Sequence, residues 1–87
     1  MSVEIYTKDN CMFCKKAKAW FQEHKIPYDE SDVSDLDAFA AMQKRIPAAK
    51  TVPQIIMDGH VIGGYDVLMQ YEQQILSKLK AKFPEAV

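Results

Sequence analysis

The segment Val3-Glu4-Ile5-Tyr6-Thr7-Lys8-Asp9-Asn10-Cys11-Met12-Phe13-Cys14 decides the fold of this 87-residue chain. Its first five residues alternate apolar and polar side chains, which predicts a short strand. The next three residues are polar and predict a turn. From 12 to 24 the apolar residues recur at helical spacing. The face they form comprises Phe13, Ala17, Trp20, Phe21 and His24. The two cysteines therefore stand where a strand ends and a helix begins.

The middle of the chain predicts a second strand and a second helix. Residues 28–33 can form a strand, although their acidic side chains weaken the pattern. Ser34 can cap the following helix, because its hydroxyl can accept a hydrogen bond from a free backbone N–H. Pro47 ends that helix. Its apolar edge comprises Phe39, Met42 and Ile46.

The last third of the chain predicts a hairpin and a final helix. Residues 54–57 and 60–62 flank Asp58-Gly59, which is a strong signal for a tight turn. Gly63-Gly64 break the second of these strands, and the chain is helical from Tyr65 onward. The apolar face of this helix comprises Leu68, Tyr71, Ile75 and Leu79.

The order of these elements is β-α-β-α-β-β-α. The first strand, helix and strand require a parallel pair with a right-handed crossover. The hairpin adds an antiparallel pair. We therefore expect an α/β fold, in which a four-stranded mixed sheet is flanked by helices, and a single domain over 1–87.

Composition excludes several classes of protein. Apolar residues make up 48% of the chain, which is typical of a globular domain. The 11 basic and 12 acidic residues give a net charge of -1, so nucleic acid is not an expected partner. No apolar run approaches the ~18 residues of a membrane span, and the first residues lack the pattern of a signal peptide. We expect a cytoplasmic monomer with no membrane partner.

The Cys11-Met12-Phe13-Cys14 motif points to redox chemistry. The first N–H groups of a helix carry partial positive charge, so the pKa of Cys11 is expected to fall. Cys14 lies one turn further in, which makes Cys11 the nucleophile and Cys14 the resolving thiol. The alternative is two small buried residues or half of a metal site. A zinc site needs about four ligands, and only His24 and His60 could join the cysteines, so no metal is expected.

Two further motifs predict a binding groove. Thr51-Val52-Pro53 precedes an apolar strand, and a cis Val52-Pro53 bond would free the backbone of Val52 to pair with an extended peptide. An ordinary trans proline is the alternative. In Gly63-Gly64-Tyr65-Asp66, a helix start with an acid can hold a carboxylate or an ammonium group. A simple turn with a helix cap is the alternative there.

Taken together, these three motifs make the chain resemble the glutaredoxins, the small glutathione-dependent proteins of the thioredoxin fold. The motifs occur in the family's order, and the resemblance spans nearly the whole chain. It implies a thioredoxin-like fold and a dithiol glutaredoxin with Cys11 as nucleophile and Cys14 as resolving residue. It also implies a set of glutathione-binding residues: Lys8, Phe13, Thr51, Val52, Pro53, Gly64, Tyr65 and Asp66.

The same resemblance implies how glutathione is held. Lys8 would contact the glycyl carboxylate, the Val52 backbone would pair with the cysteine of glutathione, and residues 64–66 would hold the γ-glutamyl end. The implied activity reduces glutathione mixed disulfides and protein disulfides, with glutathione as co-substrate. Ribonucleotide reductase is one candidate among the protein substrates.

The sequence departs from the family pattern and leaves two other functions open. Met12 and Phe13 replace the usual proline and tyrosine between the cysteines. Residues 45–50 lack the usual glycine, so Gln43, Lys44 and Lys50 remain candidates for a second carboxylate contact. The first alternative function is a [2Fe–2S] carrier, in which Cys11 of two chains and two glutathiones bridge the cluster. The second is a redoxin reduced by thioredoxin reductase.

Overall fold

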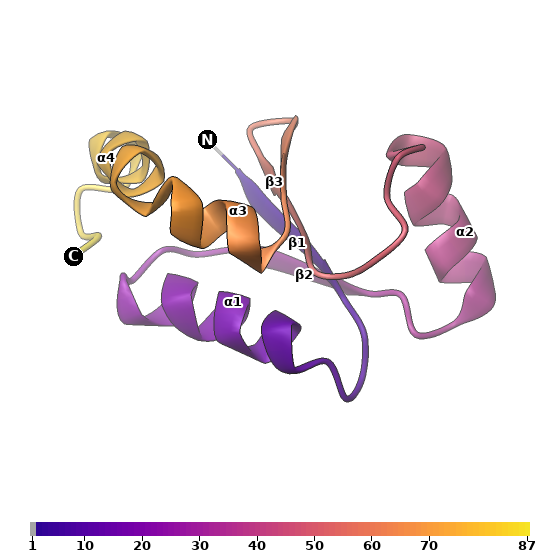
Figure 1. Ribbon diagram of the computed structural model, residues 1–87. Coiled ribbons are helices and arrows are strands. Elements are labelled where there is room, and N and C mark those ends of the chain that lie inside the picture. The colour runs from indigo at the N-terminus through magenta and orange to yellow at the C-terminus, as the bar shows by residue number, and fades with distance from the viewer. Residues whose placement is uncertain (1) are drawn as a thin grey trace.

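A four-stranded mixed sheet runs through the centre of the molecule (Figure 1). This computed structural model describes residues 2–87. The strands lie in the order β2-β1-β3-β4. Their bounds are β1 (Val3–Thr7), β2 (Asp29–Asp32), β3 (Gln54–Met57) and β4 (His60–Gly63). The β1–β2 pair is parallel and the β3–β4 pair is antiparallel, as the order of elements predicts. Strand β1 also pairs with β3, in the antiparallel direction.

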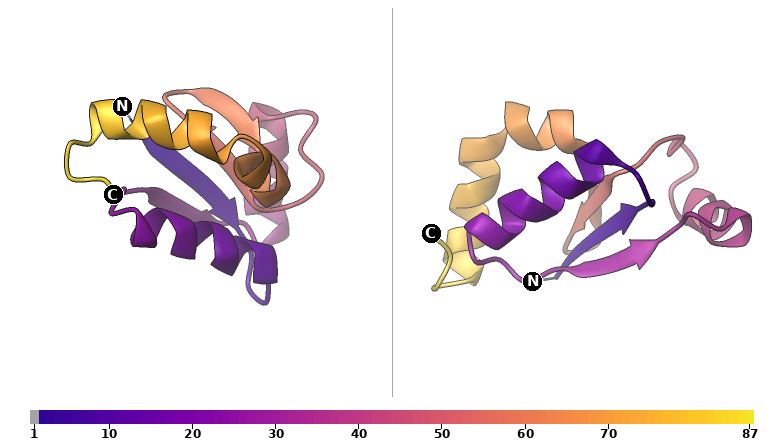
Figure 2. Two further views of the ribbon diagram at one scale, coloured as in Figure 1. Left: turned by 60° about the vertical axis from the view of Figure 1, so that its left-hand side comes forward. Right: turned by 90° about the horizontal axis from the view of Figure 1, so that it is seen from below.

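Helices cover both faces of this sheet (Figure 2). They are α1 (Met12–Glu23), α2 (Leu36–Arg45), α3 (Tyr65–Gln70) and α4 (Glu72–Lys82). Helices α1, α3 and α4 lie on one face, and α2 lies alone on the other. The predicted α/β architecture with a thioredoxin-like fold is confirmed, with one more helix than the sequence indicated.

The two faces of the sheet carry separate apolar cores, because successive strand residues point to opposite sides. Val3 and Ile5 of β1 belong to the core under α1, α3 and α4. Tyr6 and Ile56 belong to the smaller core under α2.

The turn between β3 and β4 has the backbone conformation that its Asp-Gly sequence predicts. Asp58 and Gly59 have φ values of 52° and 81°, which an Asp-Gly pair tolerates.

The prediction of one continuous helix after Gly64 is wrong. The helix is interrupted at Tyr71, between α3 and α4, where φ is -112° and ψ is 26°. Tyr71 was expected on the buried face, but its side chain is 47% exposed. The apolar spacing continues through this residue, so the pattern in the sequence did not reveal a change in helix direction.

Three smaller expectations also need correction. Phe13 was placed on the apolar face of α1, yet it is 57% exposed, because its ring stacks on the Tyr65 ring beside the start of α3. The cap of α2 is Asp35, whose side chain accepts from the N–H of Asp37. Ser34 instead accepts from the N–H of Asp9. Strand β2 forms despite its acids, because it is an edge strand with all four residues exposed.

Candidate active site

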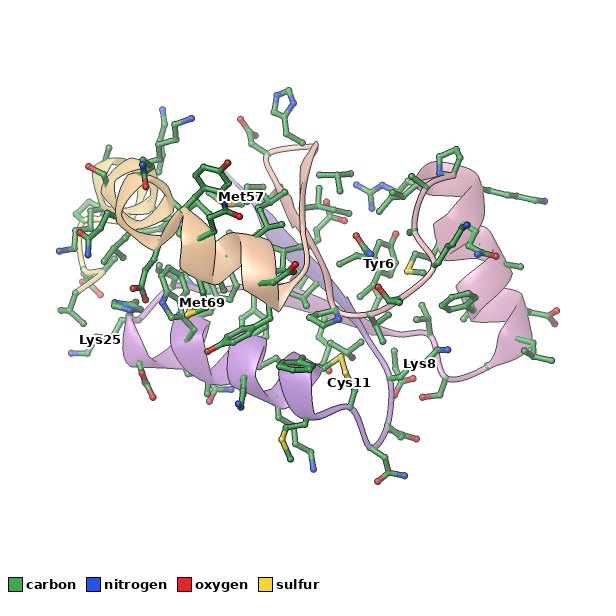
Figure 3. The ribbon with its side chains drawn as sticks, viewed as in Figure 1. Tyr6, Lys8, Cys11, Lys25, Met57 and Met69 are labelled. Carbon is green, nitrogen blue, oxygen red and sulfur yellow. A yellow bond between two sulfur atoms is a disulfide. The ribbon has the colours of Figure 1, made fainter. Side chains whose placement is uncertain are left out.

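Cys11 and Cys14 form a disulfide at the start of α1, and their Cα atoms are 5.2 Å apart. Cys11 is the N-cap residue of α1, and its sulfur accepts the N–H of Cys14 at 3.1 Å. Cys14 lies inside the helix and is 1% exposed. Cys11, which is labelled in Figure 3, is half-buried. An incoming sulfur can therefore reach Cys11, and the first turn of α1 offers its N–H groups to a thiolate there.

The turn before Cys11 is fixed by Asn10, which has a φ of 57°. Asparagine adopts this left-handed conformation more readily than most residues. The turn lets the chain leave the end of β1 and enter α1 with Cys11 at the helix start. Sequence and local geometry thus agree on where the two sulfurs lie.

The loop before β3 lies directly beside Cys11. The Val52-Pro53 bond is cis, so the trans alternative is wrong. The Cys11 Sγ lies 3.8 Å from the carbonyl oxygen of Val52. Within this loop, the side-chain amide of Gln54 donates to the carbonyl oxygen of Thr51 at 2.9 Å. These contacts place the backbone of residues 51–53 next to the redox pair.

A groove of about 340 Å³ opens at this point. One wall is the cis-proline loop, and the other comes from the first turns of α1 and α3. The rings of Phe13 and Tyr65 stack with centroids 6.0 Å apart. Lys16 lies 5.5 Å from the centroid of the Phe13 ring, which adds positive charge near the groove. The lining residues are Phe13, Thr51, Val52, Pro53, Gly64, Tyr65 and Asp66.

The two glycines before α3 allow its start to approach the proline loop. Gly63 has a φ of 127°, which side-chain-bearing residues rarely adopt. A Cβ on Gly64, the N-cap residue of α3, would lie 3.1 Å from Oδ1 of Asp66 and 3.4 Å from the carbonyl oxygen of Pro53. The absence of a side chain at Gly64 therefore keeps Asp66 and the proline loop together in the groove.

Lys8 does not line this groove. Its ammonium nitrogen lies 4.0 Å from the centroid of the Phe39 ring in α2. Figure 3 shows Lys8 between Cys11 and α2. Among the candidates for a second carboxylate contact, the amide of Gln43 donates to the carbonyl oxygen of Ala49 at 3.1 Å. Lys44 and Lys50 are exposed.

Two other cations are held by carboxylates outside the site. Arg45 donates to both oxygens of Glu4, at 2.8 and 2.9 Å, and to the hydroxyl of Tyr6. These bonds lower the pKa of Glu4 and raise that of Arg45. Lys18 pairs with Glu30 at 2.9 Å. Neither Arg45 nor Lys18 therefore adds free positive charge to the groove.

Glu30 also receives a hydrogen bond from Thr7, a buried residue at the end of β1, at 2.6 Å. The bonds from Thr7 and then Lys18 hold the pKa of Glu30 below its ordinary value. These hydrogen bonds join β1, β2 and α1. Sequence reasoning missed them, as it missed the pairs Lys8–Phe39 and Phe13–Tyr65, because each joins residues distant in the chain.

Residues 2–87 contain no group of three or more His, Cys, Asp or Glu side chains placed to hold a metal ion. Within the same residues, every helix is too short or too polar to cross a membrane. His24 packs against the Trp20 ring and contacts the carbonyl oxygen of Val87, and His60 is exposed on β4.

Comparison with known proteins identifies relatives of this chain. Residues 3–62 match the family model for glutaredoxin. Glutaredoxin 1 of Rickettsia felis is 37% identical over 98% of this chain and 91% of its own length. A glutaredoxin-like protein NrdH of Lactococcus lactis is 34% identical, over 72% of this chain and 86% of its own length.

Solved structures agree with these relatives. Glutaredoxin 1 of Francisella tularensis, complexed with cacodylate, superposes with a TM-score of 0.80 and 32% identity, over 87% of this chain and 96% of that one. A buckwheat glutaredoxin–glutathione complex gives a TM-score of 0.72 over 83% of this chain and 68% of that one. Its 24% identity shows the shared fold. With its Cys-x-x-Cys pair at the start of α1, the chain belongs to the glutaredoxin family and is a thiol–disulfide oxidoreductase.

Proposed function

We propose that the protein is a glutathione-dependent oxidoreductase, in which Cys11 exchanges with glutathione mixed disulfides. The observation that carries the proposal is the groove beside Cys11, which joins the cis-proline loop to an acid at a helix start. Glutathione is an extended tripeptide with two carboxylates and one ammonium group. The groove offers matching partners: the Val52 backbone for the tripeptide and Asp66 for the ammonium group.

The proposed exchange needs two steps. The Cys11 thiolate attacks the glutathione sulfur of a mixed disulfide, which forms a Cys11–glutathione disulfide and releases the other thiolate. A second glutathione thiolate attacks the glutathione sulfur of this adduct, which yields oxidised glutathione and restores the Cys11 thiolate. The proton of the second glutathione ends on the released thiol. One glutathione is oxidised as one mixed disulfide is reduced.

Protein disulfides follow a dithiol route in this proposal. Cys11 attacks one sulfur of the substrate, and Cys14 then attacks Cys11 and releases the substrate as a dithiol. The product on the enzyme is the Cys11–Cys14 disulfide that the structure contains. Two glutathione molecules then reduce it. Ribonucleotide reductase remains one candidate substrate for this route.

Lys8 completes the proposed glutathione site from the other side of Cys11. Its charge would attract the glycyl carboxylate, and Lys16 above Phe13 would add to the positive potential. The proposed site therefore has a cation at one end and an acid at the other. A buckwheat glutaredoxin with the same fold is named as a complex with glutathione.

A redoxin reduced by thioredoxin reductase is the competing function, favoured by the similarity to the Lactococcus protein NrdH. The experiment supplies NADPH with either glutathione plus glutathione reductase or thioredoxin reductase, and measures reduction of the Cys11–Cys14 disulfide. We expect the glutathione system to support turnover. Turnover with thioredoxin reductase alone, and none with glutathione, would overturn the proposal.

The [2Fe–2S] carrier function requires two chains per cluster. We propose instead that the protein works as a monomer in the cytoplasm, where a Cys-x-x-Cys pair can cycle through its reduced form. Anaerobic expression followed by sedimentation tests this. A colourless species with the mass of one chain is expected, and a coloured dimer whose iron leaves with glutathione would favour the carrier.

A further inference from the structure

Lys8 reaches out of the loop between β1 and α1 and rests on an aromatic ring of α2. Its ammonium nitrogen lies 4.0 Å from the ring centroid of Phe39. The two residues come from different elements, and α2 lies on the opposite face of the sheet from α1 (Figures 2 and 3). This contact therefore links the residue three positions before Cys11 to the second helix layer.

The Phe39 ring is a fixed platform. Phe39 is half-buried and packs against the core that contains Met42, Ile46 and Ile56. Its backbone N–H donates to the carbonyl oxygen of Asp35, the N-cap residue of α2, at 2.9 Å. A lysine whose ammonium group lies over this ring samples fewer side-chain conformations than a lysine that is free in solvent.

The contact with an aromatic ring leaves the positive charge of Lys8 available to a ligand. An ion pair with a carboxylate would neutralise Lys8, as Glu4 does for Arg45 and Glu30 for Lys18. Among residues 2–87, neither of the two ion pairs involves Lys8. An aromatic ring attracts a cation through its quadrupole and leaves the charge in place. Lys8 is thus held but remains able to bind an external carboxylate.

We propose that Phe39 is a positioning residue that holds the Lys8 ammonium on the α2 side of Cys11, where it meets the glycyl carboxylate of glutathione. This inference rests on the proposed function. It assigns to α2 a part in substrate recognition, although no residue of α2 lines the groove. It also implies that the aromatic ring, and not only apolar bulk, is required at position 39.

The test uses full-length protein with Cys14→Ser, so that a single exchange at Cys11 is observed. Phe39→Leu keeps an apolar side chain in the core and removes the ring. We expect a two- to fivefold lower rate constant with a glutathione mixed disulfide, the range for an exposed cation–π contact. The rate with an uncharged mixed disulfide should not change, and Phe39→Tyr should restore the glutathione rate.

A double-mutant cycle separates positioning from packing. In a Lys8→Ala background, Phe39→Leu should have no further effect on the glutathione rate. Tyr28→Leu is a matched control, because Tyr28 is a partly buried aromatic residue packed on the other core. It should leave both rates unchanged, and thermal melting should show all variants folded.

Two results would overturn the role of Phe39 while leaving the proposed function intact. In the first, Phe39→Leu slows exchange with the glutathione mixed disulfide as much when position 8 is alanine as when it is lysine. In the second, it slows the uncharged disulfide equally, which indicates a packing defect. If Lys8→Ala alone changes nothing, the placement of Lys8 against glutathione is wrong, and the role of Phe39 falls with it.

Discussion

The two sulfurs of the redox pair differ in exposure because one caps α1 and the other lies within it. The sulfur of Cys11 accepts the N–H of Cys14, and Cys14 is buried within the first turn of α1. The motif and its place after a strand were enough to predict this division from sequence. The partner of Lys8 was not predictable, because no local pattern joins Lys8 to Phe39.

The first prediction concerns the thiol of Cys11 in the reduced protein. In a Cys14→Ser variant, its pKa should lie well below the ~8.5 of a free cysteine, because the N-terminus of α1 stabilises the thiolate. Thiolate absorbance at increasing pH measures it. A midpoint at or above the free value would show that the helix start does not activate this sulfur.

The second prediction concerns the charged ends of the proposed glutathione site. Asp66→Ala and Lys8→Ala should each lower the rate with a glutathione mixed disulfide by roughly three- to a hundredfold. This range spans an exposed ion pair and a charge-assisted hydrogen bond. Added salt should shrink the effect, because part of it is Coulombic.

A neutral alkylating agent provides the control for both variants. Its rate with Cys11 should stay at the wild-type value, since the start of α1 is unchanged. Equal slowing of charged and uncharged disulfides would contradict the role of these two residues in recognising glutathione.

At the scale of elements, turn chemistry was easier to predict than helix continuity. Asp58-Gly59 forms its hairpin because two adjacent residues tolerate positive φ. The break at Tyr71 could not be predicted from the sequence, because the apolar spacing runs through both α3 and α4. The cis Val52-Pro53 bond was harder to predict than the hairpin turn and easier than the break at Tyr71. The sequence allowed it, and only its combination with the cysteines favoured it over trans.

The third prediction concerns the network that joins β1, β2 and α1 through Glu30. Because Thr7 and Lys18 lower the pKa of Glu30, the ionised form stabilises the fold. That contribution is present above the unfolded pKa of about 4.5 and is lost as pH falls through the lower folded value. Glu30→Gln should therefore cost about 0.5–1 kcal/mol at pH 7, a small figure because the pair is partly exposed.

Thermal melting at several pH values measures this contribution. The gap between wild type and Glu30→Gln should begin to narrow below about pH 4.5 and should close once the pH is below the lower pKa of the folded state. Asp29→Asn, which changes an exposed carboxylate of the same strand, is the matched control. A gap that stays constant from pH 7 to pH 3 would mean that ionisation of Glu30 does not stabilise this junction.

At the scale of the molecule, the sheet brings three distant segments to one place. The end of β1 leads into Cys11, the loop before β3 supplies Val52 and Pro53, and the turn after β4 leads to Asp66. The sequence predicted these motifs and their order, and the fold brings seven of the proposed glutathione-binding residues into one groove. Lys8 is the exception, because its side chain turns toward α2.

The central claim is that this groove selects glutathione for exchange at Cys11. The most direct measurement is the second-order rate constant of the Cys14→Ser variant with a glutathione mixed disulfide, compared with an uncharged mixed disulfide of the same leaving thiol. We predict that the glutathione mixed disulfide reacts at least about tenfold faster, and that intact mass shows one glutathione per chain on Cys11. Equal rate constants for the two disulfides would contradict it.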